Sequence, residues 1–141
     1  MNEYQKLKNK QQEEYNALPM FFALSEKSFE KGMLELGLQS TDTDKIYQTE
    51  MGMFYRKEDK PLFKETIQRF HDELQKAISE DETGDNFIYQ MFYTELINHE
   101  YAFTEDPEDA LTALNLTWEK VQADPCLKHG FEKAISKIIP Y

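Results

Sequence analysis

The sequence predicts a mostly α-helical protein with a small β component, folded as a single compact domain over residues 1–141. Two long segments, 59–79 and 86–100, repeat apolar residues with the period of an α-helix. Upstream of both, residues 46–56 contain two short β-prone runs on either side of Gly52, which predicts a small β-hairpin. With 141 residues, of which 40% are hydrophobic, the chain is long enough to bury a core.

Two helices and a short apolar run are predicted for the N-terminal part of the chain. Residues 1–15 are polar helix formers with few apolar groups, so this helix is weakly amphipathic and its start is expected to fray. Pro19 ends it, and the apolar run 20–24 is too short to be assigned to a helix. Ser25 is typical of an N-cap, and the helix that follows should end at Gly37.

The middle of the chain is predicted to pass from a turn at residues 41–44 into the hairpin and then into a long helix. Asp59 is expected to cap this helix, with Pro61 in its first turn, where a missing N–H costs nothing. The apolar stripe of the helix consists of Phe63, Ile67, Phe70, Leu74 and Ile78.

An acidic loop at residues 79–85 leads into the most apolar helix, which should end near residue 101. We expect the two long helices to pack together as the core of the domain. Asp106, Thr117 and Asp124 each have the residue type of an N-cap, so the rest of the chain, as far as residue 139, is predicted to form three short helices.

The charge balance limits the classes of partner. Twenty-seven acidic residues against 16 basic ones give a formal net charge of −11, which disfavours binding to phosphate backbones and favours cationic partners. Cys126 is the only cysteine, so a disulfide framework and a cysteine-based zinc site are both excluded within one chain. The sequence has no stretch apolar enough to span a membrane, and we expect a cytoplasmic protein.

Glu95 and His99 are the strongest functional candidates, because they lie near the centre of the apolar face of helix 86–100. Charged side chains are rarely buried there unless they are paired. The interpretation we favour is a polar node, in which the two side chains satisfy each other, a tyrosine hydroxyl or Arg56. The apolar residues of this face are Phe87, Ile88, Met91, Phe92 and Leu96.

The alternative interpretation is a catalytic or metal site. His99 would act as a general base or ligand, Glu95 would orient it or serve as a second ligand, and His71 could supply another nitrogen. Arg56 is a candidate anion anchor for such a site. The spacing does not match the metalloprotease pattern His-Glu-x-x-His, so we expect no metal or other cofactor.

Other charged motifs carry weaker signals. Asp42 and Asp44 are typical of turn chemistry, and loop 79–85 lacks the ligand spacing of a calcium loop. Residues 113–121 and the helix after them resemble a helix-turn-helix, and that helix carries Lys128, His129, Lys133 and Lys137. We expect these cations to complement the helix dipole rather than to bind DNA, because residues 106–141 still have a net charge of −2.

A set of short segments spanning most of the chain forms a recognisable pattern. It comprises residues 16–25 with Phe29, Gly32 and 36–38, then 44–47, Gly52 with 54–57, 98–101 with Thr104, and 111–117. This pattern resembles an uncharacterised family of small bacterial proteins associated with prophages and mobile elements of gut bacteria. The resemblance implies a mobile-element origin and no particular reaction. Asn115 stands where that family pattern has Gly, and Asn also tolerates positive φ.

Three classes of function follow from these observations. The sequence favours a non-enzymatic, acidic intracellular interaction protein whose partner is another protein. The alternative is a metal-binding protein or hydrolase-type enzyme that uses Glu95 and His99. A second alternative is a role with nucleic acid, through the C-terminal helices or as a DNA mimic, which the charge disfavours. The sequence leaves the oligomeric state open.

Overall fold

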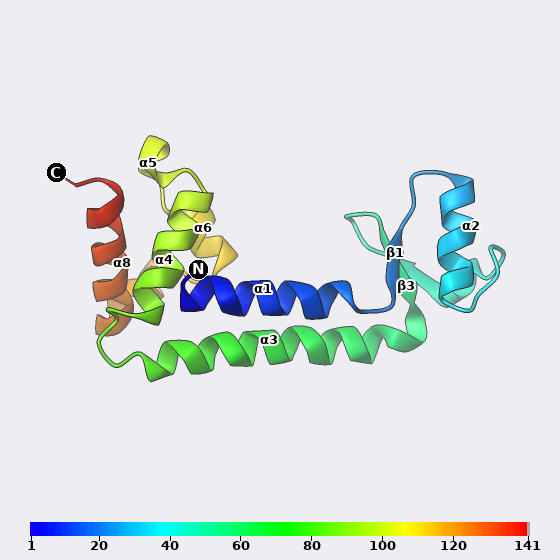
Figure 1. The fold of residues 1–141 in the computed structure, drawn as a ribbon, viewed down its shortest axis with the longest axis horizontal. Helices are drawn as coiled ribbons and strands as arrows, with labels where there is room; N and C mark the ends of the chain where they lie inside the picture. The colour runs from blue at the N-terminus through cyan, green and yellow to red at the C-terminus, as the bar shows by residue number, and fades with distance from the viewer. Residues whose placement is uncertain (141) are drawn as a thin grey trace. The chain divides into compact units, whose positions relative to one another are not determined.

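The computed structural model describes residues 1–140, which divide into two compact units (Figure 1). Unit 1 comprises Met1–Gln11 and the chain from Asp72 onward, and unit 2 comprises Gln12–His71. The boundary falls within two helices, α1 (Glu3–Asn16) and α3 (Lys60–Glu80). The predicted fold class is confirmed, since eight α-helices and one small antiparallel sheet make up the described residues. A single folding domain stays a prediction.

Unit 2 is built around a three-stranded antiparallel sheet in the order β1-β3-β2. The predicted hairpin is present as β2 (Ile46–Gln48) and β3 (Met53–Arg56), joined through Gly52 at a φ of 83°. The third strand, β1 (Met20–Phe22), comes from the apolar run that helical periodicity could not assign. This run becomes a strand because it pairs with β3, a distant segment, and sequence periodicity does not reveal such pairing.

Helix α2 (Glu26–Glu35) covers one face of this sheet with aromatic contacts. Phe21 stacks on Phe54 with ring centroids 5.2 Å apart, and Phe29 meets both rings edge-on. On the other face, Tyr55 contacts Phe63 of α3 at 4.6 Å. The core of unit 2 is therefore mainly aromatic and small.

Local signals set the ends of α2 as predicted. The Ser25 side chain accepts a hydrogen bond from the Ser28 backbone N–H, and Ser28 returns the bond, which completes a capping box. Gly37 follows the helix at a φ of 76°, the left-handed conformation that glycine adopts without strain.

The start of α3 differs from the expectation. Two short 3₁₀ helices, Thr43–Lys45 and Lys57–Asp59, flank the hairpin, and the second leads directly into α3. Asp59 does not cap the helix; it accepts a hydrogen bond from Nε of Arg56 at 2.7 Å. The predicted stripe is only partly buried, because Ile67 is 51% exposed.

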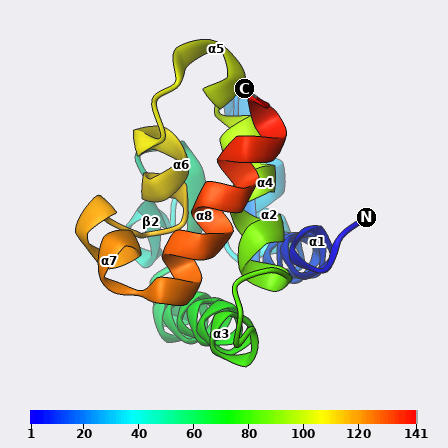
Figure 2. The same ribbon diagram turned by 90° about the vertical axis from the view of Figure 1, so that its left-hand side faces the viewer.

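Five helices of unit 1 follow α3 along the chain (Figure 2). Thr117 accepts a hydrogen bond from the Lys120 N–H, and Asp124 accepts from two N–H groups, so two of the three predicted caps are confirmed. The third is wrong: the residue at the cap position of α6 is Pro107, and Asp106 precedes it and accepts a hydrogen bond from the Glu108 N–H. The predicted series of three short helices after residue 106 is also confirmed. The five helices are α4 (Phe87–Asn98), α5 (Tyr101–Thr104), α6 (Glu108–Ala113), α7 (Trp118–Ala123) and α8 (Pro125–Ile138).

The main partner of α4 is α8, so the prediction that α3 and α4 together form the core is wrong. Gly130 allows the close approach: a Cβ there would lie 2.6 Å from Cγ2 of Ile88 and 2.8 Å from the carbonyl oxygen of Gly84. Residues of α3 lie only at the edge of this core. No helix of the described residues has the length and apolar character needed to cross a membrane.

Asp81 organises the loop between α3 and α4. Its carboxylate accepts hydrogen bonds from the N–H groups of Gly84, Asn86 and Ile88, each at 3.0 Å, and the residue is only 7% exposed. Burial by itself raises the pKa of this carboxyl group. The hydrogen bonds, led by that of Ile88, lower the pKa by more, so it lies below its ordinary value. The predicted acidic loop therefore contains one buried, structural carboxylate.

Candidate functional site

The structure brings Glu95 and His99 together at the C-terminal end of α4. Nε2 of His99 lies 3.7 Å from Oε2 of Glu95, and the amide of Asn98 donates a 3.3 Å hydrogen bond to the same carboxylate. The Glu95 side chain is 13% exposed and that of His99 is 35% exposed. Helix α4 ends at Asn98, before the predicted end near residue 101, and His99 at its C-cap reaches solvent.

Tyr4 of α1 completes the polar node within unit 1. Its side chain is 1% exposed and its hydroxyl donates a hydrogen bond to Glu95. Burial raises the pKa of Tyr4 well above its ordinary value, and the Glu95 charge and hydrogen bond raise it further. A tyrosine hydroxyl as the partner of Glu95 is one of the arrangements that the polar-node hypothesis included.

His71 does not join this pair in one cluster of ligands. It lies exposed on the part of α3 that belongs to unit 2. Among residues 1–140, no group of three or more His, Cys, Asp or Glu side chains is arranged to hold a metal ion. The chemistry of the Glu95–His99 pair therefore stays a hypothesis resting on two side chains.

Arg56, the candidate anion anchor, is held within unit 2. Its Nε donates to Asp59, and its Nη1 donates to the carbonyl oxygen of Leu36 at 3.0 Å, which ties β3 to the end of α2. The hydrogen bond from Arg56 to Asp59 raises the pKa of the guanidinium. Since two of its donors already have partners, Arg56 acts first as a clamp between two elements.

The cations predicted on the last helix make specific contacts. Nε2 of His129 lies 2.6 Å from Oδ1 of Asp85, and Nζ of Lys133 donates to the Asp85 carbonyl at 3.2 Å. Lys133 also lies 4.5 Å from the ring centroid of Tyr89. His129 lowers the pKa of Asp85, with a smaller effect of Lys133. These two side chains tie α8 to the loop before α4, in addition to any effect on the helix dipole.

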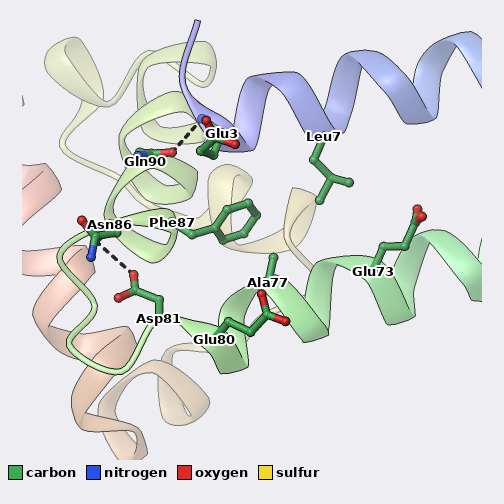
Figure 3. A pocket seen from close by; sticks show the side chains of 9 residues that line it. All are labelled: Glu3, Leu7, Glu73, Ala77, Glu80, Asp81, Asn86, Phe87 and Gln90. Atoms are coloured by element: carbon green, nitrogen blue, oxygen red, sulfur yellow. Dashed lines mark hydrogen bonds between the residues drawn. The ribbon is translucent and has the colours of Figure 1, made fainter.

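A groove of about 400 Å³ lies in unit 1 between α1, α3 and the start of α4 (Figure 3). Phe87 and Leu7 form apolar walls, and the rim carries carboxylates of α1 and α3. Each rim glutamate already has a lysine within 4 Å: Glu3 with Lys6 at 3.0 Å, Glu73 with Lys10 at 3.7 Å, and Glu80 with Lys76 at 3.9 Å. The groove therefore has little uncompensated charge with which to select a ligand.

The most exposed large hydrophobic side chain among the described residues of unit 1 is Phe103, at 89% exposure, on α5. The short helix is anchored by Tyr101, which is 9% exposed and belongs to the core of unit 1. Tyr101 and Phe103 are two positions apart, which is about 200° around a helix, so one ring points inward and the other outward. Figure 2 shows α5 at the end of unit 1, beyond α4 and α6. We call Phe103 and the α5 backbone the aromatic knob.

Two left-handed residues fix the direction of the knob. Glu100 precedes α5 at a φ of 60° and Glu105 follows it at a φ of 55°. Glutamate gains nothing from this conformation, which costs about 1–2 kcal/mol per residue. The Glu105 N–H donates to the Tyr101 carbonyl at 2.8 Å and the Phe103 N–H donates to the Glu100 carbonyl at 3.0 Å, so the strained turn is held in place. Strain of this kind is concentrated at binding and switch sites.

The knob lies within a long segment without positive charge. No Lys or Arg occurs between Lys76 and Lys120, whereas eleven acidic residues do. Unit 1 contains 16 acidic and 8 basic residues, and unit 2 contains 11 and 8. The acidic residues closest in sequence to the knob are Glu100, Glu105, Asp106, Glu108 and Asp109.

The comparison with family models decides the classification, because one model matches residues 3–137. The chain belongs to this family. Its description is "Family of unknown function (DUF7659)", so membership carries no activity with it. No curated protein and no solved structure matches the chain.

The aromatic knob is the feature that sequence periodicity missed. Phe103 follows Leu96 by seven residues, so a continuous helix would place it on the buried face of α4. The break at Glu100 turns it outward instead. No sequence signal distinguishes Phe103, because it is one of several aromatic residues in the segment without lysine or arginine between Lys76 and Lys120.

Proposed function

We propose that the protein is a non-enzymatic interaction protein and that the aromatic knob of unit 1 is its principal contact with another protein. The exposure of Phe103 on a rigidly held turn is the observation that carries this proposal. Aromatic residues dominate the binding energy of protein interfaces, and fully burying a phenylalanine contributes about 1.5–3 kcal/mol.

The knob is ordered before binding, which favours this role. Tyr101 anchors α5 in the core and the two left-handed glutamates hold its ends. A side chain that is already presented in one direction loses less conformational entropy when a partner covers it. By contrast, an exposed phenylalanine on a freely moving loop would lose conformational entropy on binding, and this loss would offset more of the favourable free energy of burying the ring.

The surroundings of the knob define the chemistry of the partner. The ring needs an apolar pocket, and the carboxylates of Glu100 and Glu105, the residues that bound α5, favour lysine or arginine at the rim of that pocket. Like charges at the rim would instead repel the acidic segment. We therefore propose a protein partner with a small apolar pocket and a basic rim.

A photo-crosslinking phenylalanine analogue at position 103 tests this proposal in cells that express the protein. The expected result is a discrete crosslinked adduct that survives denaturing electrophoresis. The same analogue at Leu34 of unit 2, which is 69% exposed, is the matched control for exposure alone. No adduct at position 103, or the same adducts at both positions, would overturn the proposal.

We further propose, from the resemblance of its sequence pattern, that the protein originates from a bacterial prophage or mobile element. The single cysteine, Cys126, which is not part of a disulfide, supports a reducing compartment and hence a cytoplasmic location. Detection of the tagged protein in the cytosolic fraction of its own host cell checks the location, and its recovery outside that fraction would contradict it.

A further inference from the structure

We infer that the partner of the aromatic knob is a second copy of this chain, and that the knob binds on α3 of that copy's unit 2. This inference rests on the proposed function, because it names the partner that the knob requires. The complementary surface lies on the protein itself: two adjoining hollows on α3, which we call the α3 hollow, provide an apolar surface with a basic rim.

The apolar part of the α3 hollow is a space of about 320 Å³ lined by Phe63, Lys64, Ile67 and Gln68. Ile67 belongs to the apolar stripe that the sequence assigns to the core, yet 51% of it is exposed. Leu62, on the same helix, is 42% exposed. A stripe residue that its own unit does not cover is what a docked aromatic ring would bury.

The basic rim belongs to the adjoining space of about 520 Å³, lined by Lys57, Lys60, Pro61, Lys64 and Glu65. Nζ of Lys57 and Nζ of Lys60 each lie 5.3 Å from the ring centroid of Tyr47. Among the residues that the structure describes, Lys57, Lys60 and Lys64 take part in no ion pair. Their ammonium groups are therefore available to the carboxylates of a docked chain.

The two surfaces are complementary in both respects. The knob offers an exposed ring on a short helix bounded by Glu100 and Glu105, and the α3 hollow offers exposed aliphatic carbon beside lysines. The knob lies in the segment between Lys76 and Lys120, which contains no lysine or arginine that would repel the lysines of the α3 hollow. Because the contact joins two unlike surfaces, copies would associate head to tail.

The first measurement is the mass of the purified protein in solution as a function of concentration and salt. At low salt, light scattering after size exclusion should show species above 16.7 kDa that increase with concentration. The association should weaken as salt screens the charges at the rim. A mass of one chain at all concentrations and both salt levels would overturn the inference.

Charge reversal identifies the two surfaces. Lys60→Glu with Lys64→Glu should abolish association, and so should Glu100→Lys with Glu105→Lys. A mixture of these two double variants should associate again, because each supplies the reversed charge that the other needs. Circular dichroism of each variant confirms that it folds. If the mixture stays monomeric while both variants are folded, the contact is not between these surfaces.

The analogue at position 103 distinguishes this inference from the proposed function. In the purified protein alone, an adduct of two chains that disappears in Lys60→Glu with Lys64→Glu supports the second copy. An adduct formed only in cells, with a different protein, overturns the second copy and leaves the proposed function standing. No adduct under either condition overturns both.

Discussion

The two units of this protein differ in how completely they bury their apolar residues. Among the described residues, the core cluster of unit 1 contains thirteen buried side chains, from Tyr4 on α1 to Ala134 on α8. The cluster in unit 2 contains three: Phe21, Met33 and Leu36. In unit 1, α5, α6 and α8 all contact α4, whereas unit 2 has one short complete helix and three short strands beside its parts of α1 and α3.

This difference shows which apolar side chains could contact another molecule without any change in the packing of either core. Unit 2 leaves several apolar side chains largely exposed, and two of them, Leu62 and Ile67, lie on α3. Unit 1 exposes Phe103 most strongly, on a separate turn outside its core, and also leaves Met1, Ile97 and Trp118 partly exposed. The other strongly exposed apolar residues of unit 2 are Phe22, Leu24, Leu34 and Met51.

The largest expected effect comes from emptying the core of unit 1. Phe92→Ala removes a ring that is 0% exposed and packs edge-on against Phe131 at 5.3 Å, so we expect a loss of about 3–5 kcal/mol in the free energy of unfolding. Phe54→Ala in unit 2 should cost roughly half as much, because its ring is only partly buried. Urea unfolding, followed by circular dichroism, measures both. Equal losses of unfolding free energy for the two variants would contradict the difference in burial between the two units.

Two glycines with similar backbone angles separate strain from packing. Gly84 of unit 1 has a φ of 84° and a Cβ there would overlap the carbonyl oxygen of Cys126, so Gly84→Ala should cost about 2–4 kcal/mol. Gly37 of unit 2 has a φ of 76° and nothing within 4 Å of its Cβ position. Gly37→Ala should therefore cost only the conformational strain of about 1–2 kcal/mol. The midpoints of thermal unfolding compare the two, and a larger loss for Gly37→Ala would contradict the closer packing of unit 1.

Asp81→Asn tests the acidic loop that unit 1 has closed around a carboxylate. Losing charge-assisted hydrogen bonds to three N–H groups should cost about 1.5–3 kcal/mol at neutral pH. Because the pKa of Asp81 is lowered in the folded state, its contribution is present above the ordinary aspartate pKa of about 3.9. That contribution is lost as the pH falls through the folded-state pKa. The difference between wild type and Asp81→Asn should shrink in acid, and a constant difference would contradict this account.

The smallest effects come from two tyrosines of α1, one in each unit. Tyr4→Phe removes the hydrogen bond to Glu95 and should cost about 0.5–1.5 kcal/mol. Tyr15→Phe removes a 3.4 Å contact with Sδ of Met53, a weak acceptor, and should cost less. The raised pKa of Tyr4 also means that the unfolded chain loses this proton first, so wild type should lose stability above about pH 10.

Tyr4→Phe should lose less stability than wild type over the same alkaline range, because it has no proton to release at that position. Unfolding midpoints between pH 8 and pH 11 measure this difference. An identical alkaline decline in both proteins would show that other groups cause it. Unchanged stability of Tyr4→Phe at pH 7 would show that Glu95 has an equivalent partner elsewhere.

The sequence predicted the local elements because their signals are local. Ser25, Thr117 and Asp124 carry side chains that accept a backbone N–H within three residues, so their positions as caps can be recognised before folding. Asn115 adopts a φ of 55°, as its residue type allows. The hairpin around Gly52 and the three short helices at the C-terminus are further examples.

The candidate site was predicted in part. The Glu95–His99 pair is a spacing of four residues on one helix, so its proximity follows from helix geometry alone. Tyr4, its hydroxyl partner, is 91 positions away from Glu95 in the sequence and could be named only as a class of residue. The third ligand that a metal site would need could not be tested by spacing, because it had to come from another element.

What the sequence determined by itself is most of the helices and turns, the caps at Ser25, Thr117 and Asp124, the acidic charge and the absence of a disulfide partner for Cys126. Tertiary structure alone decided that β1 joins the hairpin, that α8 rather than α3 packs against α4, and that Phe103 points outward. The physical reason is the range of the interactions. Capping and periodicity act within a few residues, whereas pairing, close packing at Gly130 and the strained turn at Glu100 depend on groups that only the fold brings together.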